Sequence, residues 1–317
     1  MLRVEVDWAP AYELVVSLSA FVSRREHKTL ELGTEWIKKV RAQISPDLAR
    51  ELSVPGAVDH VDAIDLLIGQ CPGERGAGDF LHWFGSLSPG ELYERLAPHI
   101  VKGRNDLLTD LDAFRRHHVA LLTAWNEQYF CGADPAILGG LAAEAEATRQ
   151  SAGTQPPSQL LEAVTNGLLL REEADETVLL VPQYHYRPWN LFSAYRDCRL
   201  ILYPADAVPP APGEPPPELV RVARALSDPS RLRLLRHLAQ GPRSFSELVR
   251  FSGLSKSTVH HHMVILRAAR LVRILDTDEF PGIYILRPAA FDETGVYLRD
   301  YLSADDLDAL GEGEDHV

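Results

Sequence analysis

The chain has 317 residues, of which 45% are hydrophobic and 24% are charged, and its formal net charge is −13. This composition is typical of a globular protein long enough for two domains, and no apolar run approaches the ~20 residues that span a bilayer. The three cysteines, Cys71, Cys131 and Cys198, are far apart and form no CxxC pair. They exclude a disulfide-stapled scaffold and predict reduced thiols in a cytoplasmic protein without a membrane partner.

The first two hundred residues are predicted to be mainly helical. Three helix starts are marked by a capping side chain directly before a proline: Ser45, Ser88 and Asp134. The apolar periodicity predicts a long helix from about residue 105 to residue 130. Two apolar runs, 177–181 and 199–203, are typical of short strands. The sequence therefore predicts a helical domain with a small β element in this region.

A proline-rich stretch follows, with seven prolines between residues 204 and 217. Proline at this density favours an extended, semi-rigid spacer over a helix or a central strand. We therefore expect a helical sensor or dimerisation domain (1–203), a linker (204–217) and a C-terminal domain (218–317).

Charge is distributed unevenly along the chain. Residues 218–290 contain twelve basic and six acidic residues, so this part carries +6 and the remainder carries −19. A local basic domain on an acidic body favours a polyanionic partner such as nucleic acid.

Helix and strand signals follow one another closely beyond the linker. Helices are predicted over 218–226, 230–240, 245–251, 256–269 and 289–302, and strands over 271–275 and 282–286. Ser244 and Glu247 form a capping box before the third of these helices. Gly253 suits a left-handed turn, and Ser255 can cap the helix that follows. A short helix, a glycine turn and a helix with a polar start form the helix-turn-helix layout, and the later hairpin has the position of a wing. The predicted fold class is therefore mainly α with minor β, with a winged helix-turn-helix after the helical domain.

Helical periodicity assigns two faces to the helix over 256–269. At ~100° per residue, one side carries Val259, Met263 and Leu266, which we expect to pack against neighbouring helices. The opposite side carries the residues expected to meet a DNA groove: Ser257, His260, His261 and Val264. Lys256 and Thr258 lie in the first turn, where they can reach phosphates. His262 lies at the edge of the packed side and is expected to be structural.

The segments 226–242, 246–248 and 254–273 together resemble the ArsR-type winged helix-turn-helix family of bacterial transcription regulators. The resemblance covers roughly the last third of the chain and implies a homodimer that binds a pseudo-palindromic DNA operator, with recognition helices ~34 Å apart. Carried over by position, it implies that Ser257, Thr258, His260 and His261 read DNA and that Lys256 contacts the backbone. The N-terminal region resembles, less specifically, the helical domain ahead of such modules in some bacterial regulators, and no residue role is carried over from it.

A metal-sensing role is not predicted. Many relatives bind metal through a Cys-x-Cys in the third helix or through an acid and histidine set in the last helix. Here the third helix has no cysteine and the last has no histidine. The histidine run 260–262 also fits a metal poorly, because adjacent helical side chains point ~100° apart. We expect no metal and no cofactor.

The wing departs from the family pattern at its tip. Asp276, Asp278 and Glu279 make the tip acidic, so we do not expect it to contact DNA. Arg273 and Arg287, on the wing strands, are better candidates for phosphate contacts. The full set of candidate DNA-contacting residues is Ser255, Lys256, Ser257, Thr258, His260, His261, Arg273 and Arg287.

Three hypotheses remain for the function. The first is a repressor whose N-terminal domain responds to a non-metal small molecule or partner, with a candidate aromatic pocket formed by Trp83, Trp125, Tyr184, Tyr186 and Trp189, although such residues are more often core packing. The second is an enzyme with an appended DNA-binding module, whose candidates are His82, Asp79, His117, His118 and His185. These lie in no recognisable catalytic motif, so we do not expect an enzyme. The third is a constitutive DNA-binding protein without a ligand.

Overall fold

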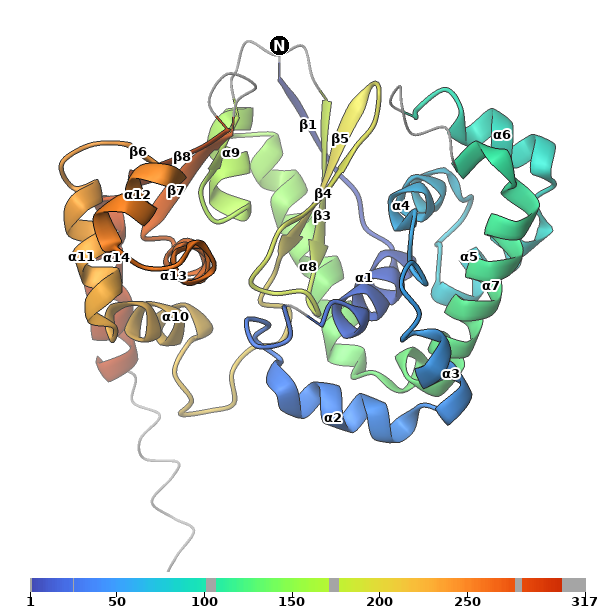
Figure 1. Ribbon diagram of the computed structural model, residues 1–317, viewed down its shortest axis with the longest axis horizontal. Helices are drawn as coiled ribbons and strands as arrows, with labels where there is room; N and C mark the ends of the chain where they lie inside the picture. The colour runs from blue at the N-terminus through green and yellow to red at the C-terminus, as the bar shows by residue number, and fades with distance from the viewer. Residues whose placement is uncertain (1, 25, 101–106, 171–176, 277–280, 304–317) are drawn as a thin grey trace, which may run out of the picture. The chain divides into compact units, whose positions relative to one another are not determined.

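The computed structural model describes residues 2–24, 26–100, 107–170, 177–276 and 281–303. The chain divides into two compact units: unit 1 comprises Met1–Pro157 and Glu173–Ala207, and unit 2 comprises Ser158–Glu172 and Val208–Val317. Each unit has its own apolar core. As predicted, the fold is mainly α with minor β (Figure 1).

Helices make up most of unit 1. They are α1 (Pro10–Val22), α2 (Gly33–Gln43), α3 (Pro46–Glu51), α4 (Val61–Gln70), α5 (Ala77–Ser86), α6 (Pro89–Leu96), α7 (Leu111–Gln128) and α8 (Pro135–Ala152). The three predicted caps are confirmed: the side chains of Ser45, Ser88 and Asp134 accept hydrogen bonds from backbone N–H groups at the starts of α3, α6 and α8. The core of this unit contains large, fully buried side chains, among them Tyr12 and Trp125.

The long helix α7 begins later than the expected position near residue 105. Asp110 is the reason, because its side chain accepts a hydrogen bond from the backbone N–H of Ala113 at 2.9 Å and so caps the helix. A 3-10 turn, Leu107–Thr109, precedes the cap, and residues 105 and 106 lie outside the described part of the chain.

A four-stranded sheet lies among these helices. Its strands are β1 (Arg3–Val6), β3 (Thr177–Gln183), β5 (Cys198–Pro204) and β4 (Leu191–Ala194), in that spatial order. The first three are parallel, and β4 runs antiparallel to β5. Helices α1 and α8 both contact β3. The strands predicted at 177–181 and 199–203 are thus confirmed as β3 and β5, whereas β4 has only four residues, with Phe192 and Ala194 exposed, and gives a weak sequence pattern.

Unit 2 contains the remaining elements. Its helices are α9 (Pro157–Val164), α10 (Pro217–Leu226), α11 (Pro229–Leu238), α12 (Phe245–Ser252), α13 (Lys256–Ala268) and α14 (Ala289–Ser303). Its sheet has the strand order β2 (Leu168–Leu169), β7 (Val272–Asp276), β8 (Pro281–Leu286) and β6 (Arg243–Ser244). Strands β7 and β8 are antiparallel and form the hairpin in the position of a wing. The predicted succession of helices and strands beyond the linker is therefore present.

The segment 158–172 belongs to unit 2, although the sequence places it within the N-terminal domain. Strand β2 pairs in parallel with β7, and the backbone N–H of Ile274 donates to the carbonyl of Gly167 at 2.8 Å. Gly167 has a φ of 89°, and a Cβ there would lie 3.0 Å from the carbonyl oxygen of Val272, so this close approach requires glycine. A strand of two residues leaves no periodicity in the sequence, which explains why this pairing is not foreseen.

The proline-rich stretch does not begin as a free spacer. Ala205 and Ala207 are buried, and a Cβ added to Gly140 of α8 would lie 1.7 Å from the carbonyl oxygen of Ala207. Asp206 forms an ion pair with Arg187, in which Oδ1 lies 2.6 Å from Nη1. The first residues of the predicted linker therefore pack within unit 1.

Candidate DNA-binding interface

Helices α12 and α13 are fixed by local hydrogen bonds that the sequence specifies. The Ser244 hydroxyl accepts from the backbone N–H of Glu247 at 3.3 Å, and the Glu247 carboxylate accepts from the backbone N–H of Ser244 at 2.8 Å. Gly253 takes the left-handed conformation, with a φ of 69°. Ser255 then caps α13 by accepting from the backbone N–H of Thr258 at 3.1 Å. The predicted capping box, glycine turn and helix cap are all confirmed.

One side of α13 is packed as expected. Val259, Met263 and Leu266 are each at most 1% exposed and belong to the core of unit 2. His262 is also buried, and its Nδ1 lies 3.5 Å from Nη1 of Arg231. Burial lowers the pKa of His262, as does the charge of Arg231, while Asp228 opposes the shift. The structural role expected for His262 is consistent with this position.

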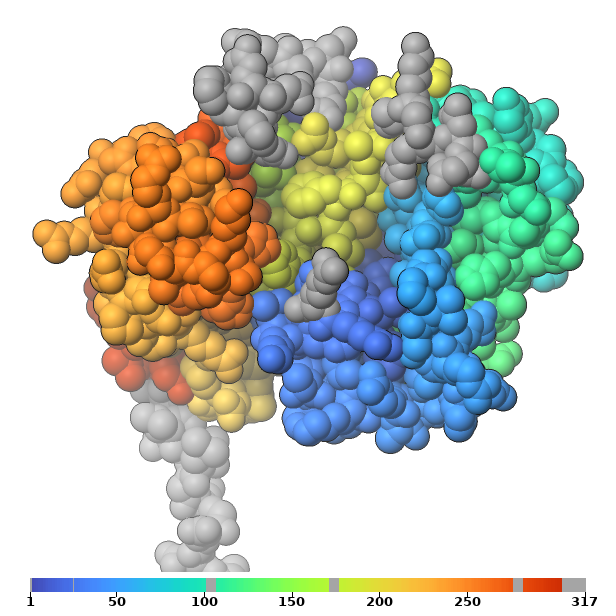
Figure 2. Space-filling view, in the orientation of Figure 1, coloured from blue at the N-terminus to red at the C-terminus, as the bar shows by residue number. Residues whose placement is uncertain are grey.

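The other side of α13 presents polar side chains at its start. Lys256, Ser257 and His260 are exposed, as is Ser255, while Thr258 and His261 are half-buried. Figure 2 shows that the helix-turn-helix segment, in orange, reaches the molecular surface in this view. Burial lowers the pKa of His261, and the nearby charges of Arg231 and His260 lower it further. His261 is therefore an uncharged hydrogen-bonding group at neutral pH.

Val264 is a correction to the expected groove-facing set. Helical periodicity predicts that Val264 lies on the free side, but it is only 8% exposed. Helix α13 contacts α10, α11, α12 and β7, so more of its circumference is covered than a single apolar stripe indicates. The exposed residues of α13, Lys256, Ser257 and His260, thus all lie in its first two turns.

The two wing arginines are already engaged by carboxylates. Nε of Arg273 lies 2.6 Å from Oε1 of Glu162, an ion pair whose N–H is not aligned as a hydrogen bond. Arg287 donates two hydrogen bonds to Glu293, at 2.9 and 2.8 Å. A DNA phosphate would have to displace these carboxylates, which counts against the phosphate-contact role expected for both residues. The acidic tip formed by Asp276, Asp278 and Glu279 lies outside the part of the chain whose side chains the structure describes.

Part of the basic charge in this region is structural. Arg231 is buried and donates from Nε to the carbonyl of Ala225 and from Nη2 to the carbonyl of Arg224, both at 2.7 Å. These carbonyls lie at the end of α10, so Arg231 joins α10 to α11. Arg233, Arg236 and Arg250 remain exposed and available to a polyanion.

The aromatic residues expected to form a ligand pocket have packing partners of their own. Trp125 is fully buried and donates from Nε1 to the Ser17 hydroxyl at 3.0 Å, and Trp83 on α5 packs beneath the guanidinium of Arg95. Tyr184 packs against the guanidinium of Arg187, and Trp189 donates to Thr29 at 3.0 Å. Tyr186 also lines the pocket of ligand size that is described below. A common ligand pocket formed by all five residues stays a prediction.

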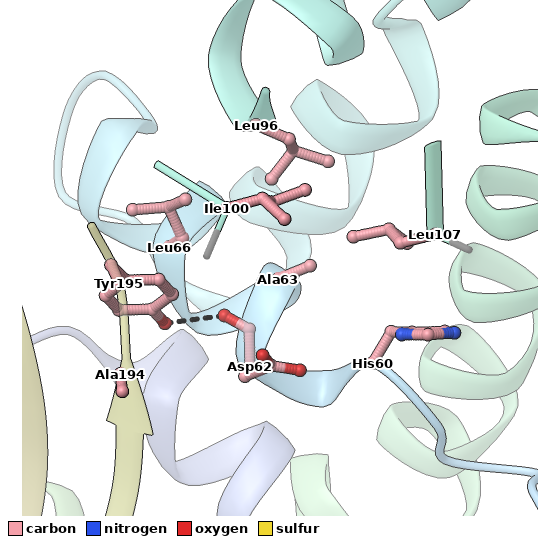
Figure 3. A pocket seen from close by; sticks show the side chains of 9 residues that line it. All are labelled: His60, Asp62, Ala63, Leu66, Leu96, Ile100, Leu107, Ala194 and Tyr195. Carbon is pink, nitrogen blue, oxygen red and sulfur yellow. Dashed lines mark hydrogen bonds between the residues drawn. The ribbon is translucent and has the colours of Figure 1, made fainter. Parts of the chain in front are cut away.

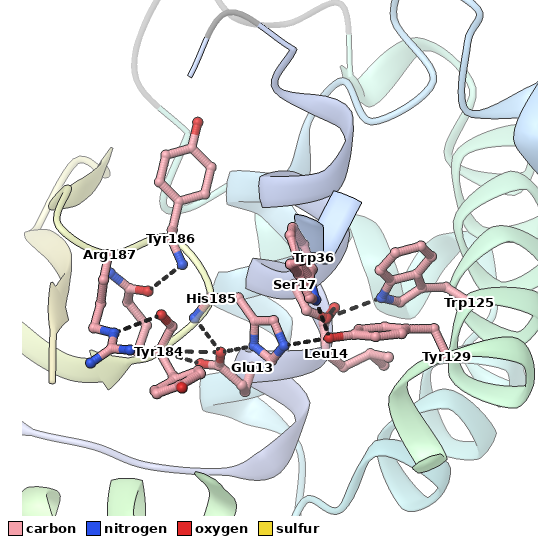
Figure 4. Close-up of polar contacts among 11 residues, drawn as sticks. Glu13, Leu14, Ser17, Trp36, Trp125, Tyr129, Tyr184, His185, Tyr186 and Arg187 are labelled. Atoms are coloured by element: carbon pink, nitrogen blue, oxygen red, sulfur yellow. Dashed lines mark hydrogen bonds and ion pairs between the residues drawn. The ribbon is translucent and has the colours of Figure 1, made fainter. Parts of the chain in front are cut away.

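Three of the four histidines considered for catalysis have structural partners. His117 and His118 bond to backbone carbonyls, those of Ala57, Asp59 and Phe114. Nδ1 of His185 lies 2.5 Å from Oε1 of Glu13, and its Nε2 lies 2.7 Å from the Tyr129 hydroxyl (Figure 4). Glu13 and His185 are 0% and 1% exposed, so a substrate has no access to them. His82 and Asp79 are exposed on α5.

Comparison with known proteins supports the assignment of the helix-turn-helix. Residues 228–273 match the family model described as bacterial regulatory protein, arsR family. The match runs from the cap of α11 through α12 and α13 into β7. Searches of curated proteins and of solved structures found no match. The C-terminal part of the chain thus carries an ArsR-type helix-turn-helix, which indicates a DNA-binding transcriptional regulator.

No helix among the described residues is both long enough and apolar enough to cross a membrane. Within the same residues, no group of three histidine, cysteine or acidic side chains is placed to hold a metal ion.

Proposed function

We propose that the chain is a sequence-specific transcriptional repressor that binds an operator as a homodimer and inserts α13 into the major groove. The observation that carries this proposal is the two-sided character of α13. Its packed side is anchored by Val259, Met263 and Leu266, while its first two turns present exposed polar side chains. A recognition helix needs this combination, because its N-terminal residues contact base edges while its other face holds it rigidly.

Each residue of the exposed set has a distinct proposed role. Lys256 pairs with a phosphate at the start of α13, where the helix dipole also favours negative charge. The Ser257 hydroxyl and the His260 imidazole hydrogen-bond to base edges. Thr258 and the uncharged His261 supply additional hydrogen bonds at the margin of the contact, and Ser255 mainly holds the helix start. We leave Arg273 and Arg287 out of the interface because they are paired with Glu162 and Glu293.

The homodimer is proposed to form through α14. Phe291, Leu298 and Leu302 are 41%, 44% and 67% exposed. At 3.6 residues per turn they fall within a narrow stripe on one side of the helix. An exposed apolar stripe on the last helix fits a second copy of the same helix across a two-fold axis, since that arrangement buries the same residues on both sides.

Unit 1 is proposed to act as a non-enzymatic sensor of a small-molecule effector in the cytoplasm. Its most catalysis-like group, the pair of Glu13 and His185, is sealed in the core. We propose repression by occupation of a promoter, which requires DNA binding by unit 2 and no further surface. Effector binding would then lower operator affinity by favouring a different conformation of the protein.

Selection from random double-stranded DNA with the purified full-length chain tests this function. We expect enrichment of a pseudo-palindrome whose half-sites are spaced by about one helical turn, ~10 bp centre to centre, or a multiple of it. Failure to enrich any sequence would overturn the proposal, and enrichment of a single asymmetric half-site would overturn the homodimer.

A further inference from the structure

A pocket of about 380 Å³ opens in unit 1 between α1, α4 and β4. This volume lies within the range that accommodates a small organic molecule. Most of its wall is apolar, formed by Val15, Val16, Val58, Val61, Leu191, Phe192, Ala194 and Leu202. Its polar lining consists of three serines, Ser19, Ser23 and Ser193, with Tyr186, Asp62 and Asp65. Phe192 is half exposed.

Asp65 is the unusual member of this lining. It is 6% exposed, and among the described residues its Oδ1 has no hydrogen-bond partner. Ser193 bonds to the Asp65 carboxyl, while the neighbouring phenols donate elsewhere: Tyr12 to the Asp7 carboxylate at 2.9 Å, and Tyr195 to the backbone carbonyl of Asp62 at 2.6 Å. A buried carboxyl oxygen without a partner is costly, and Asp65 lines the pocket, so a ligand that donates to this carboxyl group would remove the cost.

The charge of the pocket selects the sign of that ligand. Asp62 lies one turn before Asp65 on α4, and none of the described lining residues is basic. Burial raises the pKa of Asp65 well above its usual value, and the charge of Asp62 adds to this effect. Burial therefore disfavours the carboxylate form of Asp65, and a cation beside it would favour that form.

The neighbouring cavity does not compete for this role. It shares Asp62 and Ala194 with the larger pocket and is otherwise lined mostly by apolar side chains such as Leu66, Leu96 and Ile100 (Figure 3). Its volume is about 20 Å³, which is enough for one water molecule and not for an organic ligand.

We propose that the pocket between α1, α4 and β4 binds a small organic ammonium ion, with the ammonium group against Asp65 and Asp62 and the apolar body against the valines of α1 and α4. This inference rests on the proposed sensor role of unit 1 and names the chemical class of its effector. Ser193 positions the Asp65 carboxyl, and Phe192 covers the apolar body at the exposed strand β4.

Benzylamine is a suitable probe because it is protonated at pH 7 and has a compact apolar body. Binding to the full-length chain without DNA is measured by isothermal titration calorimetry and compared with benzyl alcohol and benzoate, which have similar shapes and different charge. We expect benzylamine to bind at least tenfold more tightly than either. Asp65→Asn should weaken benzylamine binding at least about thirty-fold, as expected for loss of a desolvated charge partner.

Two further variants distinguish binding in this pocket from a non-specific effect of the protein's negative charge. Ser19→Phe fills the pocket without changing its charge and should also abolish binding, whereas Asp59→Asn removes an exposed carboxylate that does not line the pocket and should leave binding unchanged. Circular dichroism establishes that each variant is folded. Equal binding of benzyl alcohol, undiminished binding by Asp65→Asn, or no binding of benzylamine to the wild type would overturn the inference.

The DNA selection described above separates this inference from the proposed function. If benzylamine binds through Asp65 and no DNA sequence is enriched, the ammonium site is supported and the proposed regulator function is rejected. If a sequence is enriched and benzylamine does not bind, the regulator role stands and the pocket assignment fails.

Discussion

Arg273 of β7 and Glu162 of α9 form an ion pair, with Nε and Oε1 2.6 Å apart and with the two side chains 33% and 20% exposed. Nε of Arg287 lies 3.8 Å from the same carboxylate oxygen, so one glutamate faces two guanidinium groups. This carboxylate links α9, and with it the segment 158–170, to both strands of the hairpin. It makes that segment a structural part of the DNA-binding unit.

We therefore expect Glu162→Gln to weaken unit 2 by about 1 kcal/mol, since the pair is only partly buried. Hydrogen–deuterium exchange at the β7 amides, including that of Ile274, should become faster. Arg273→Ala should have a similar effect on exchange and should leave the salt dependence of operator binding unchanged. The exposed Arg236→Ala serves as the control for exchange. A smaller salt slope with unchanged exchange in Arg273→Ala would instead assign Arg273 to a phosphate.

The second prediction concerns the pH dependence of unit 1. Burial by itself raises the pKa of Asp7, but two hydrogen bonds from Arg75, at 2.7 and 2.6 Å, and the charge of Arg75 outweigh it, so the folded pKa lies below the usual value. The unfolded state therefore binds more protons than the folded state. The Asp7–Arg75 pair stabilises the folded protein fully above the unfolded pKa of about 3.9, and this stabilisation is lost as the pH falls through the folded pKa of Asp7.

Asp7→Asn should accordingly lower the free energy of unfolding by about 2 kcal/mol at pH 7, somewhat less than for a fully buried pair. The difference between the variant and the wild type should shrink as pH falls below about 4. All five tryptophans lie in unit 1, so tryptophan fluorescence during urea unfolding reports on this unit. A difference that stays constant from pH 7 to the acid limb would contradict the ionic account of the pair.

A third prediction concerns the buried network around His185 (Figure 4). The Tyr129 hydroxyl accepts from Trp36 Nε1 at 2.7 Å and lies 2.7 Å from His185 Nε2. Tyr129→Phe leaves both nitrogens without this partner and should cost about 2 kcal/mol of unfolding free energy. Tyr93→Phe, at a residue that is 54% exposed, is the matched control and should cost almost nothing. If Tyr129→Phe is as stable as this control, the network does not hold unit 1 together.

The fourth prediction tests the dimer. Leu298→Asp places a charge in the apolar stripe of α14 and should convert the dimer to a monomer in sedimentation equilibrium. Val296→Asp changes a residue of similar exposure, 43% against 44%, on a different side of the same helix. It should leave the dimer intact. Dissociation by both variants, or by neither, would count against this stripe as the interface.

The helix-turn-helix was predictable from sequence because its signals are local. The Ser244 and Glu247 capping box, the left-handed Gly253 and the Ser255 cap each act within a few residues, and the structure has all three. The core stripe of α13 likewise follows from helical periodicity alone.

Features that depend on distant contacts were not predictable in the same way. Val264 is buried because α13 has neighbours on several sides. The partner of Arg273 is Glu162, which is far away in the sequence, so sequence patterns do not indicate this ion pair. Residue type alone suggests one aromatic pocket, yet Trp125 bonds to Ser17 of α1 whereas Trp83 of α5 packs against Arg95 of α6. The proposed ammonium site between α1, α4 and β4 depends on Asp65. In the sequence Asp65 is one acidic residue in an ordinary helical pattern, and only the tertiary structure shows that it is buried without a partner for Oδ1.

The most direct test of the central claim is the affinity of the Ser257→Ala/His260→Ala double variant for the selected operator, measured by fluorescence anisotropy over a range of salt concentrations. We predict a loss of at least about tenfold in specific affinity, with unchanged non-specific binding and an unchanged salt slope, because base contacts carry specificity and phosphate contacts carry the salt dependence. Lys256→Ala, by contrast, should weaken specific and non-specific binding alike and reduce the salt slope by about one. Wild-type operator affinity in the double variant would contradict the assignment of α13 as the recognition helix.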